Sequence, residues 1–189
     1  MVWLADRFNY MALDSLLKRK LKTALVLAFI AGFIALFIRP QYREGEASLR
    51  GRQAKNFAFT LDGKPANLSD LRGKVVVLNF WATWCPPCVD ETPSLIQLQK
   101  NIAPLGGTVL GISLDDNQDA YRSFLKTYKV DFPTYRDPSK KSALDYGTTM
   151  YPETYIINRE GRIDRKIIGP QDWTSPRMMA YMDSILGDK

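Results

Sequence analysis

The two cysteines of this 189-residue chain, Cys85 and Cys88, are the side chains best suited to chemistry, and two residues separate them. They stand in the stretch NFWATWCPPCVDETP, residues 79–93. Two thiols at this spacing can bind a metal, close a structural disulfide or exchange disulfides with another molecule. Glu91 follows Cys88 by three residues, so a helix here would place a carboxyl group one turn from the second thiol.

Composition argues against the first two of these roles. A structural zinc site needs four ligands, and the chain has no histidine and no third cysteine. A crosslink over two intervening residues closes too small a loop to remove much entropy from the unfolded chain. Redox exchange is the remaining interpretation. We expect neither a metal nor a bound cofactor.

A buried strand followed by a helix would position the thiols. The run VVVLNFWA, residues 75–82, is almost continuously apolar, as in a central strand covered on both faces. Pro86 and Pro87 end it and can begin a helix. Cys85 would lie at the helix N-terminus, where free N–H groups and the helix dipole lower the pKa of a thiol. We therefore expect Cys85 to attack and Cys88 to resolve.

The rest of the pattern predicts one α/β domain with a mixed sheet. Alternation over residues 57–61 and an Asp-Gly turn signal at 62–63 predict an N-terminal hairpin. The other expected elements are strands at 108–114, 153–158 and 162–169, helices through 121–128, 143–146 and 174–186, and a loop containing Pro133 and Pro138.

An apolar run near the N-terminus predicts a membrane anchor. Residues 24–38 carry no charge, and basic residues flank them on both sides. The run is shorter than the roughly 20 residues that usually span a bilayer, but Lys22 and Arg39 can snorkel and extend it. Because no small-x-small cleavage site follows, we expect a retained signal-anchor. A cleaved signal peptide and a buried soluble helix are the alternatives.

Flanking charge predicts how this anchor is oriented. Four basic residues precede the run closely and two follow it, which places the N-terminus in the cytoplasm. We expect a cytoplasmic segment at 1–20, a transmembrane signal-anchor at 21–39, a linker at 40–54 and the catalytic domain at 55–189. In a bacterium the cysteines would then face the oxidising periplasm.

The net charge of +6 does not indicate a nucleic-acid partner. Residues 1–39 hold six Lys and Arg against two Asp and Glu, whereas residues 40–189 hold twenty against eighteen. Most of the excess charge therefore belongs to the predicted anchor. The remaining mixture of signs lacks the basic block that nucleic-acid binding needs.

The motif FWATWCPPC, followed about sixty residues later by YPETYIINREG, resembles the thioredoxin fold. More specifically, it is similar to the membrane-anchored TlpA/ResA/CcmG-like thiol-disulfide oxidoreductases. The resemblance covers roughly residues 54–186 and implies a central mixed sheet flanked by helices. It implies that Cys85 and Cys88 are the redox pair. It also places Pro152 at the family's cis-proline, which helps to bind an extended substrate strand.

The resemblance further implies a proton route beside the resolving thiol. Glu91 matches the acidic residue that these relatives place near it, and a partly desolvated carboxylate there could move protons as Cys88 changes state. Asn79 stands where cytoplasmic thioredoxins carry a buried aspartate, so Glu91 would substitute for that group. A surface glutamate stabilised by the helix dipole is the alternative.

Substrate contacts are expected around the redox pair. Trp84 would flank a docked substrate, and Pro86 and Pro87 would stiffen the turn between the thiols. Tyr151 precedes the cis-proline position and is bulkier than the residue many relatives carry there. The resemblance therefore does not imply that this protein shares the substrate preference of those relatives.

Glu153 and a cluster of three aspartates are further candidate site residues. Glu153, in a PET string shared with the CcmG-like subgroup, either lines the groove or points to solvent at a strand start. The cluster of Asp115, Asp116 and Asp119 imitates a cation site, but we expect a solvated strand-to-helix loop with capping residues.

The resemblance implies a reductant of protein disulfides. Apocytochrome c before haem attachment is the first candidate substrate, and a membrane protein of the CcdA/DsbD type is the implied electron donor. A general periplasmic reductase or oxidase with another substrate stays open, because the sequence does not set the reduction potential. A peroxiredoxin-like peroxide reductase needs no adjacent cysteine pair, and a metallochaperone would place histidine or methionine ligands beside the cysteines.

Overall fold

The computed structural model describes residues 18, 20–30, 32, 49–61 and 63–187. The chain forms two compact units, residues 1–41 and 42–189, and residues 20–30 of the first are helical. None of the helices in the described residues is long and apolar enough to cross a membrane. Most of the predicted segment 1–20, the second half of the predicted anchor and the predicted linker up to residue 48 lie outside the described residues.

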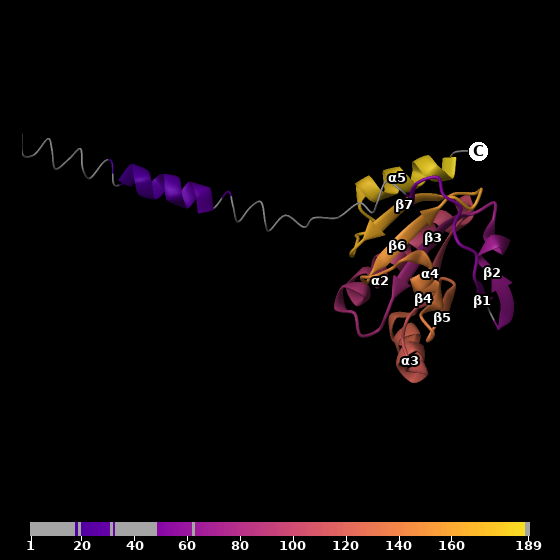
Figure 1. The fold of residues 1–189 in the computed structure, drawn as a ribbon. Coiled ribbons are helices and arrows are strands. Elements are labelled where there is room, and N and C mark those ends of the chain that lie inside the picture. The colour runs from indigo at the N-terminus through magenta and orange to yellow at the C-terminus, as the bar shows by residue number, and fades with distance from the viewer. Residues whose placement is uncertain (1–17, 19, 31, 33–48, 62, 188–189) are drawn as a thin grey trace, which may run out of the picture. The chain divides into compact units, whose positions relative to one another are not determined.

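A five-stranded mixed sheet in the order β5-β4-β3-β6-β7 forms the centre of the second unit (Figure 1). Its strands are β3 (Val75–Trp81), β4 (Gly107–Ser113), β5 (Thr134–Arg136), β6 (Glu153–Ile157) and β7 (Ile163–Ile168). The β3–β4 and β4–β5 pairs are parallel, and the β3–β6 and β6–β7 pairs are antiparallel. Every residue of β3, β4 and β6 is buried, as continuous apolar runs predict. The predicted α/β domain with a central mixed sheet is confirmed.

Helices α2 (Pro86–Ile102) and α5 (Pro176–Gly187) pack on one face of this sheet. Side chains alternate along β3, so Val75 and Val77 contact these helices while Val76 and Leu78 belong to the core on the other face. That second core includes Phe59 and residues of helix α4 (Lys141–Tyr146). Helix α3 (Gln118–Tyr128) packs against Trp81 through Phe124.

A small antiparallel hairpin precedes the sheet, in the region where the sequence predicts one. It consists of β1 (Ala58–Leu61) and β2 (Lys64–Asn67), and short 3-10 helices follow at η2 (Leu68–Leu71) and η3 (Ala103–Leu105). The end of the predicted linker packs on the domain. Gly51 N donates to Ile163 O, and Ala54 N donates to Gly161 O. These residues pair through their backbone, which needs no apolar pattern in the sequence.

Strand β5 was not expected, since the sequence there predicted a loop. Four residues separate Pro133 from Pro138, and so short a segment gives no periodicity that could be recognised. The strand forms because its backbone pairs with the edge of β4, with Gly111 opposite Thr134. Its position matters for the site, because Arg136 lies at its end.

Candidate active site

Cys85 and Cys88 form a disulfide at the start of α2, with their Cα atoms 5.3 Å apart. Cys85 is the N-cap residue of the helix, and its carbonyl accepts hydrogen bonds from the N–H groups of Cys88 and Val89. Pro86 and Pro87 occupy the first two helical positions, where the missing N–H groups have no intrahelical partner. The strand-to-helix junction predicted from the sequence is therefore present.

The two sulfurs are not equally accessible. Cys85 is 5% exposed and Cys88 is 1% exposed, so the first cysteine offers more surface to a substrate than the second. Both pack in one cluster with Trp81, Ala82 and Phe124. This order of burial matches the predicted roles of an attacking and a resolving cysteine.

An aromatic rim stands beside the disulfide. Trp84 is 59% exposed, and its ring meets that of Tyr151 edge to face at 5.9 Å between centroids. Tyr151 also packs against the cluster that contains both cysteines, and the peptide bond from Tyr151 to the buried Pro152 is cis. Pro86, which follows Cys85 directly in the chain, is exposed, and Pro87 is half-buried. The structure thus places the expected substrate-binding residues around Cys85.

Glu91 is buried, with 3% of its surface exposed. Its Oε1 accepts a hydrogen bond from Asn79 Nδ2 at 2.8 Å. Its Oε2 accepts from Gln171 N at 3.1 Å and from Trp173 Nε1 at 3.2 Å. Burial raises the pKa of this carboxyl from 4.5 to about 7, against the opposing effect of these three hydrogen bonds. The alternative of a surface glutamate is therefore wrong.

The polar groups around Glu91 come from three parts of the chain. Asn79 lies on β3 and also donates to Thr154 Oγ1 of β6 at 2.9 Å. Gln171 and Trp173 lie in the loop between β7 and α5, about eighty residues from Glu91 in sequence. Sequence reasoning missed Thr154, Gln171 and Trp173, because no local motif connects them to the cysteines. The isolated tryptophan just before a helix was the one available signal.

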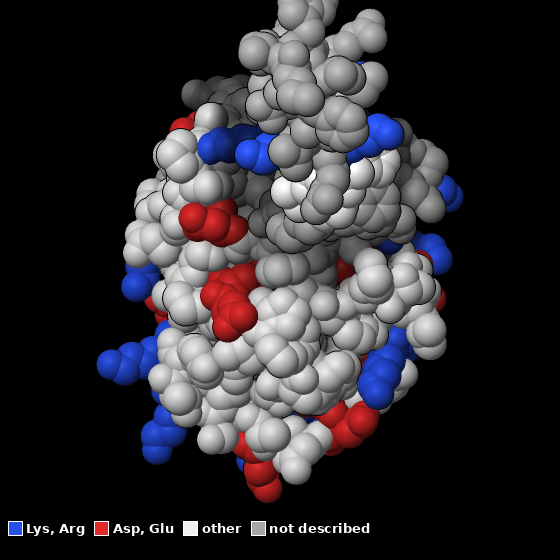
Figure 2. Space-filling model, turned by 90° about the vertical axis from the view of Figure 1, so that its left-hand side faces the viewer, with Lys and Arg blue, Asp and Glu red and all other residues white. Residues whose placement is uncertain are grey.

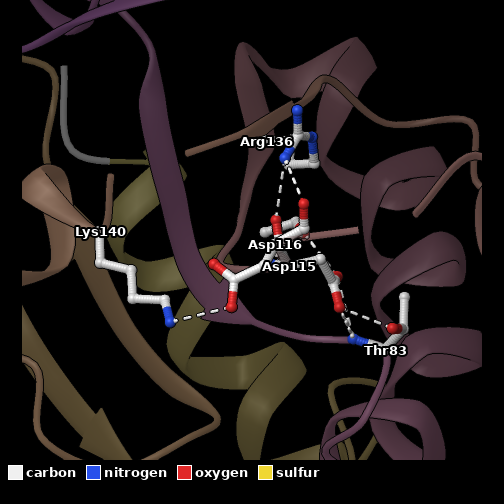
Figure 3. Close-up of polar contacts among 6 residues, drawn as sticks. Thr83, Asp115, Asp116, Arg136 and Lys140 are labelled. Atoms are coloured by element: carbon white, nitrogen blue, oxygen red, sulfur yellow. Dashed lines mark hydrogen bonds and ion pairs between the residues drawn. The ribbon is translucent and has the colours of Figure 1, made fainter. Parts of the chain in front are cut away.

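Asp115 was expected in a solvated loop, but it is 1% exposed. Figure 3 shows its carboxylate directed at Thr83, two residues before Cys85. It accepts from Thr83 N at 3.1 Å, from Thr83 Oγ1 at 2.6 Å and from Ser113 Oγ at 2.7 Å. Arg136 Nη1 donates to the carbonyl oxygens of Asp115 and Asp116. The expectation failed because Thr83 and Arg136, which hold this residue in place, lie 32 and 21 residues away in sequence.

The rest of that acidic cluster behaves as expected. Asp116 and Asp119 are exposed, and Asp116 forms an ion pair with Lys140 at 3.4 Å (Figure 3). The cap of α3 is Asn117, whose side chain accepts from the N–H groups of Asp119 and Ala120. The described residues contain no group of three or more acidic, histidine or cysteine side chains that could hold a metal ion.

Glu153 neither lines the groove nor points to solvent, since it is 1% exposed. It forms an ion pair with Lys166 Nζ and accepts from Tyr155 Oη at 2.6 Å. Alternation along β6 directs Glu153 and Tyr155 to the face of the sheet opposite to Thr154. Glu153 therefore stabilises the fold next to Pro152 from the far side of the sheet.

The surface charge is mixed on the face that Figure 2 presents. Lys and Arg lie mainly towards its rim, Asp and Glu lie both near its centre and at its lower edge, and uncharged residues separate them. This face offers no continuous basic surface of the kind that phosphate backbones bind.

The buried disulfide, the exposed aromatic rim and the mixed sheet define a dithiol oxidoreductase. Comparison with known proteins agrees. The AhpC/TSA family model matches residues 50–166, and the chain belongs to this family. Its relatives include the thiol-disulfide oxidoreductase ResA of Bacillus cereus, 31% identical over 88% of this chain and 96% of the relative. The thioredoxin-like protein YneN of Bacillus subtilis is 34% identical over 80% of this chain and 91% of its own.

A solved structure gives the same result. A thiol:disulfide interchange protein of the thioredoxin family from Chlorobium tepidum TLS superimposes with a TM-score of 0.63 and 31% identity, covering 73% of this chain and 98% of its own. The predicted thioredoxin-like fold and the resemblance to the ResA-type proteins are confirmed. The chain is a thiol-disulfide oxidoreductase.

Proposed function

We propose that this protein is a membrane-tethered reductant of protein disulfides that acts outside the cytoplasmic membrane of a bacterium. The observation that carries the proposal is the Cys85–Cys88 disulfide at the start of α2, with the buried Glu91 one helical turn further on. The apolar, charge-flanked run at residues 24–38 supports the tether and its orientation.

The reaction transfers two electrons from the enzyme dithiol to a substrate disulfide. The Cys85 thiolate attacks one substrate sulfur, which breaks the substrate disulfide, forms a mixed disulfide and expels the other sulfur as a thiolate that takes up a proton. Cys88 then loses its proton and attacks Cys85 Sγ. This second step breaks the mixed disulfide, releases the second substrate thiolate and leaves the enzyme oxidised. The substrate is reduced to a dithiol.

Glu91 serves as the proton acceptor for Cys88. A carboxyl group with a pKa of about 7 can accept and return a proton at neutral pH, which an ordinary surface glutamate cannot do efficiently. Its position on the same face of α2 as Cys88 directs this exchange to the resolving thiol rather than to solvent. The chain has no histidine to take this role.

The proposed substrate is apocytochrome c before haem attachment, and the proposed electron donor is a membrane protein of the CcdA/DsbD type. The Trp84–Tyr151 rim supports an extended polypeptide as the substrate, because exposed aromatic rings next to the buried disulfide can hold the residues that flank a cysteine. The relatives named thiol-disulfide oxidoreductase support the class of chemistry, an exchange between thiols and disulfides.

The Cys88→Ser variant tests the proposal. Without the resolving thiol, the mixed disulfide through Cys85 should accumulate, and apocytochrome c added in its oxidised form should be trapped on the enzyme. The matched control, Cys85→Ser, should trap nothing. Failure of Cys88→Ser to trap any protein while the unaltered enzyme still reduces insulin would contradict the proposed mechanism.

Two further measurements test the remaining parts. Protease treatment of intact spheroplasts that express the full chain should remove the catalytic domain if it lies outside the membrane, and protection of that domain would contradict the location. Peroxide consumption by the reduced enzyme should stay at the rate of free dithiols. A faster turnover would favour a peroxide reductase on this fold.

A further inference from the structure

The loop between β7 and α5 closes over the Glu91 carboxyl group. Two of the three donors that reach Glu91 come from this loop, and both bind the same oxygen, Oε2. The third donor, Asn79 Nδ2, binds Oε1 from β3. The orientation of the carboxyl plane is therefore set by the strand on one side and by the loop on the other.

This loop is held by other contacts to the redox site. Gly169 N donates to Pro152 O at 2.9 Å, which connects its first residue to the cis-proline. Ser94 Oγ on α2 accepts from Trp173 N at 3.2 Å and lies 3.4 Å from Gln171 O. The loop is thus bonded to both structures that border the disulfide, the cis-proline segment and the helix that carries the cysteines.

Trp173 anchors the loop. Its side chain is fully buried and packs in the core under α2 and α5 with Leu95, Leu98 and Ile167. The indole can be fixed by apolar packing alone, and yet its N–H is directed at Glu91 Oε2 at 3.2 Å. The indole N–H of Trp81, in contrast, has no hydrogen-bond partner within the described part of the chain. A buried indole N–H in this domain can thus lack a hydrogen-bond acceptor, whereas the indole N–H of Trp173 has the Glu91 carboxyl group as its acceptor.

We propose that Trp173 is a positioning residue for the redox reaction, whose indole N–H holds the Glu91 carboxyl group in place one helical turn from Cys88. The inference rests on the proposed proton exchange between Glu91 and Cys88. The β7–α5 loop excludes water from Glu91 and, at the same time, supplies donors that stabilise its ionised form. Trp173 thereby keeps a buried carboxylate able to ionise at neutral pH.

The electrostatic surroundings make this effect measurable. The groups that face Glu91 are the neutral amide of Asn79, the N–H of Gln171 and the indole of Trp173, with the hydroxyl of Thr154 behind Asn79. The nearest charged residues in the chain are Asp90 on its own helix and Asp172 in the loop, and both are exposed, while the two cysteines are joined in a disulfide. A change at Trp173 should therefore act on Glu91 through one hydrogen bond.

The test is the Trp173→Phe variant in the full chain. Phenylalanine fills most of the indole volume and removes the donor. The titration midpoint of the Glu91 carboxyl carbon, followed by NMR in the oxidised protein, should move to higher pH, so that the ratio of ionised to protonated Glu91 at pH 7 falls about tenfold, as expected for losing one hydrogen bond to a charged group. The pH profile of disulfide reduction should move in the same direction.

Matched variants separate this effect from a general loss of packing. Trp81→Phe removes a buried indole that has no hydrogen-bond partner and should leave the Glu91 midpoint unchanged. In a Glu91→Gln background, Trp173→Phe should not move the pH profile further. Should Trp173→Phe fail to fold, site-specific replacement of Trp173 by benzothienylalanine, which keeps the ring shape and lacks the N–H, takes its place in every measurement.

The outcomes are distinguishable. An unchanged or lowered Glu91 midpoint in the Trp173 variants, or an equal shift of the pH profile in the Glu91→Gln background, would overturn the role of Trp173. In that case the proposed function would still stand if Glu91→Gln alters the pH profile of disulfide reduction. If Glu91→Gln itself has no effect on the profile, the proton role of Glu91 fails, and the inference fails with it.

Discussion

Two buried carboxyl groups lie on opposite faces of the central sheet, and their surroundings differ. Glu91 lies on α2 and faces β3 and the β7–α5 loop, and the partners of its two oxygens are neutral donors. Glu153 faces the other core, where Lys166 supplies a cation and Tyr155 a hydroxyl. Both sites involve neighbouring residues of β6, because Thr154 belongs to the Glu91 network and Glu153 is the preceding residue.

The difference shows that burial alone does not decide what a carboxyl group can do. At Glu153 an ammonium group compensates the charge, so the side chain can hold strands β6 and β7 together as an ion pair. At Glu91 no donor carries a charge, and burial raises its pKa to about 7. Glu91 can therefore gain and lose a proton in the pH range where an enzyme works. The Glu153 site is structural, whereas the Glu91 site is suited to proton transfer.

The largest expected effect comes from breaking the ion pair with Lys166→Met. Glu153 would then be buried without a cation, which costs about 3–5 kcal/mol of unfolding free energy. Urea denaturation at pH 7 measures this loss. The double variant Lys166→Met with Glu153→Gln should regain much of it, because the uncompensated charge is gone. A loss below about 1 kcal/mol would mean that the pair is not structural.

Glu91→Gln sharpens the comparison through pH. The folded pKa of Glu91, about 7, lies above its ordinary value of 4.5, so the folded state binds the proton more tightly. The stability that this proton provides is fully present below about pH 4.5 and is lost as the pH rises through about 7, a change on the order of 3 kcal/mol. Glu91→Gln should lack this decrease. Parallel stability curves for the two proteins between pH 5 and 8 would contradict it.

Asn79→Asp should make the Glu91 site less tolerant of charge. The new carboxyl group would lie where Asn79 Nδ2 now donates to Oε1 at 2.8 Å, so the two acids would share one proton. We expect an additional loss of about 2 kcal/mol as the pH rises from 6 to 8, compared with the unaltered protein. Asn79→Ser controls for loss of the amide. Equal pH dependence in both variants would exclude the shared proton.

The smallest effect is expected at Asp115, a third buried carboxylate. Like Glu91, Asp115 accepts its hydrogen bonds from neutral donors. Thr83→Val removes the hydroxyl that donates to Asp115 Oδ1 at 2.6 Å and should cost about 1–2 kcal/mol of unfolding free energy. Thr83→Ser keeps the hydroxyl and should cost less. If both variants lose the same stability, packing of the threonine methyl group, and not the hydrogen bond, holds this segment.

Local patterns allowed much of the fold to be predicted. The junction at Cys85 could be recognised because an apolar run, two prolines and the thiol spacing all lie within fourteen residues. Strand β5 could not, because three residues on a sheet edge form only when β4 is already there. The formation of β5 depends on its pairing with β4 rather than on its own amino-acid composition.

The same division applies to the site. Cys85, Cys88 and Glu91 are close in sequence, and their side chains could be assigned before the structure was known. The groups that determine the state of Glu91 and the position of Thr83 could not be assigned, since Trp173 and Asp115 come from segments 82 and 32 residues away. Hydrogen-bond partners at such distances leave no periodic trace in a sequence.

The small exposed area at the redox pair limits the shape of any molecule that can exchange disulfides with it. Only a twentieth of the Cys85 surface is open, and the resolving sulfur is closed off behind it. In-line attack needs three sulfurs to align, so a target cystine must project from its own backbone to reach this opening. Cystines packed inside folded domains would be excluded by shape alone, whereas those in extended or unfolded segments could reach the redox pair.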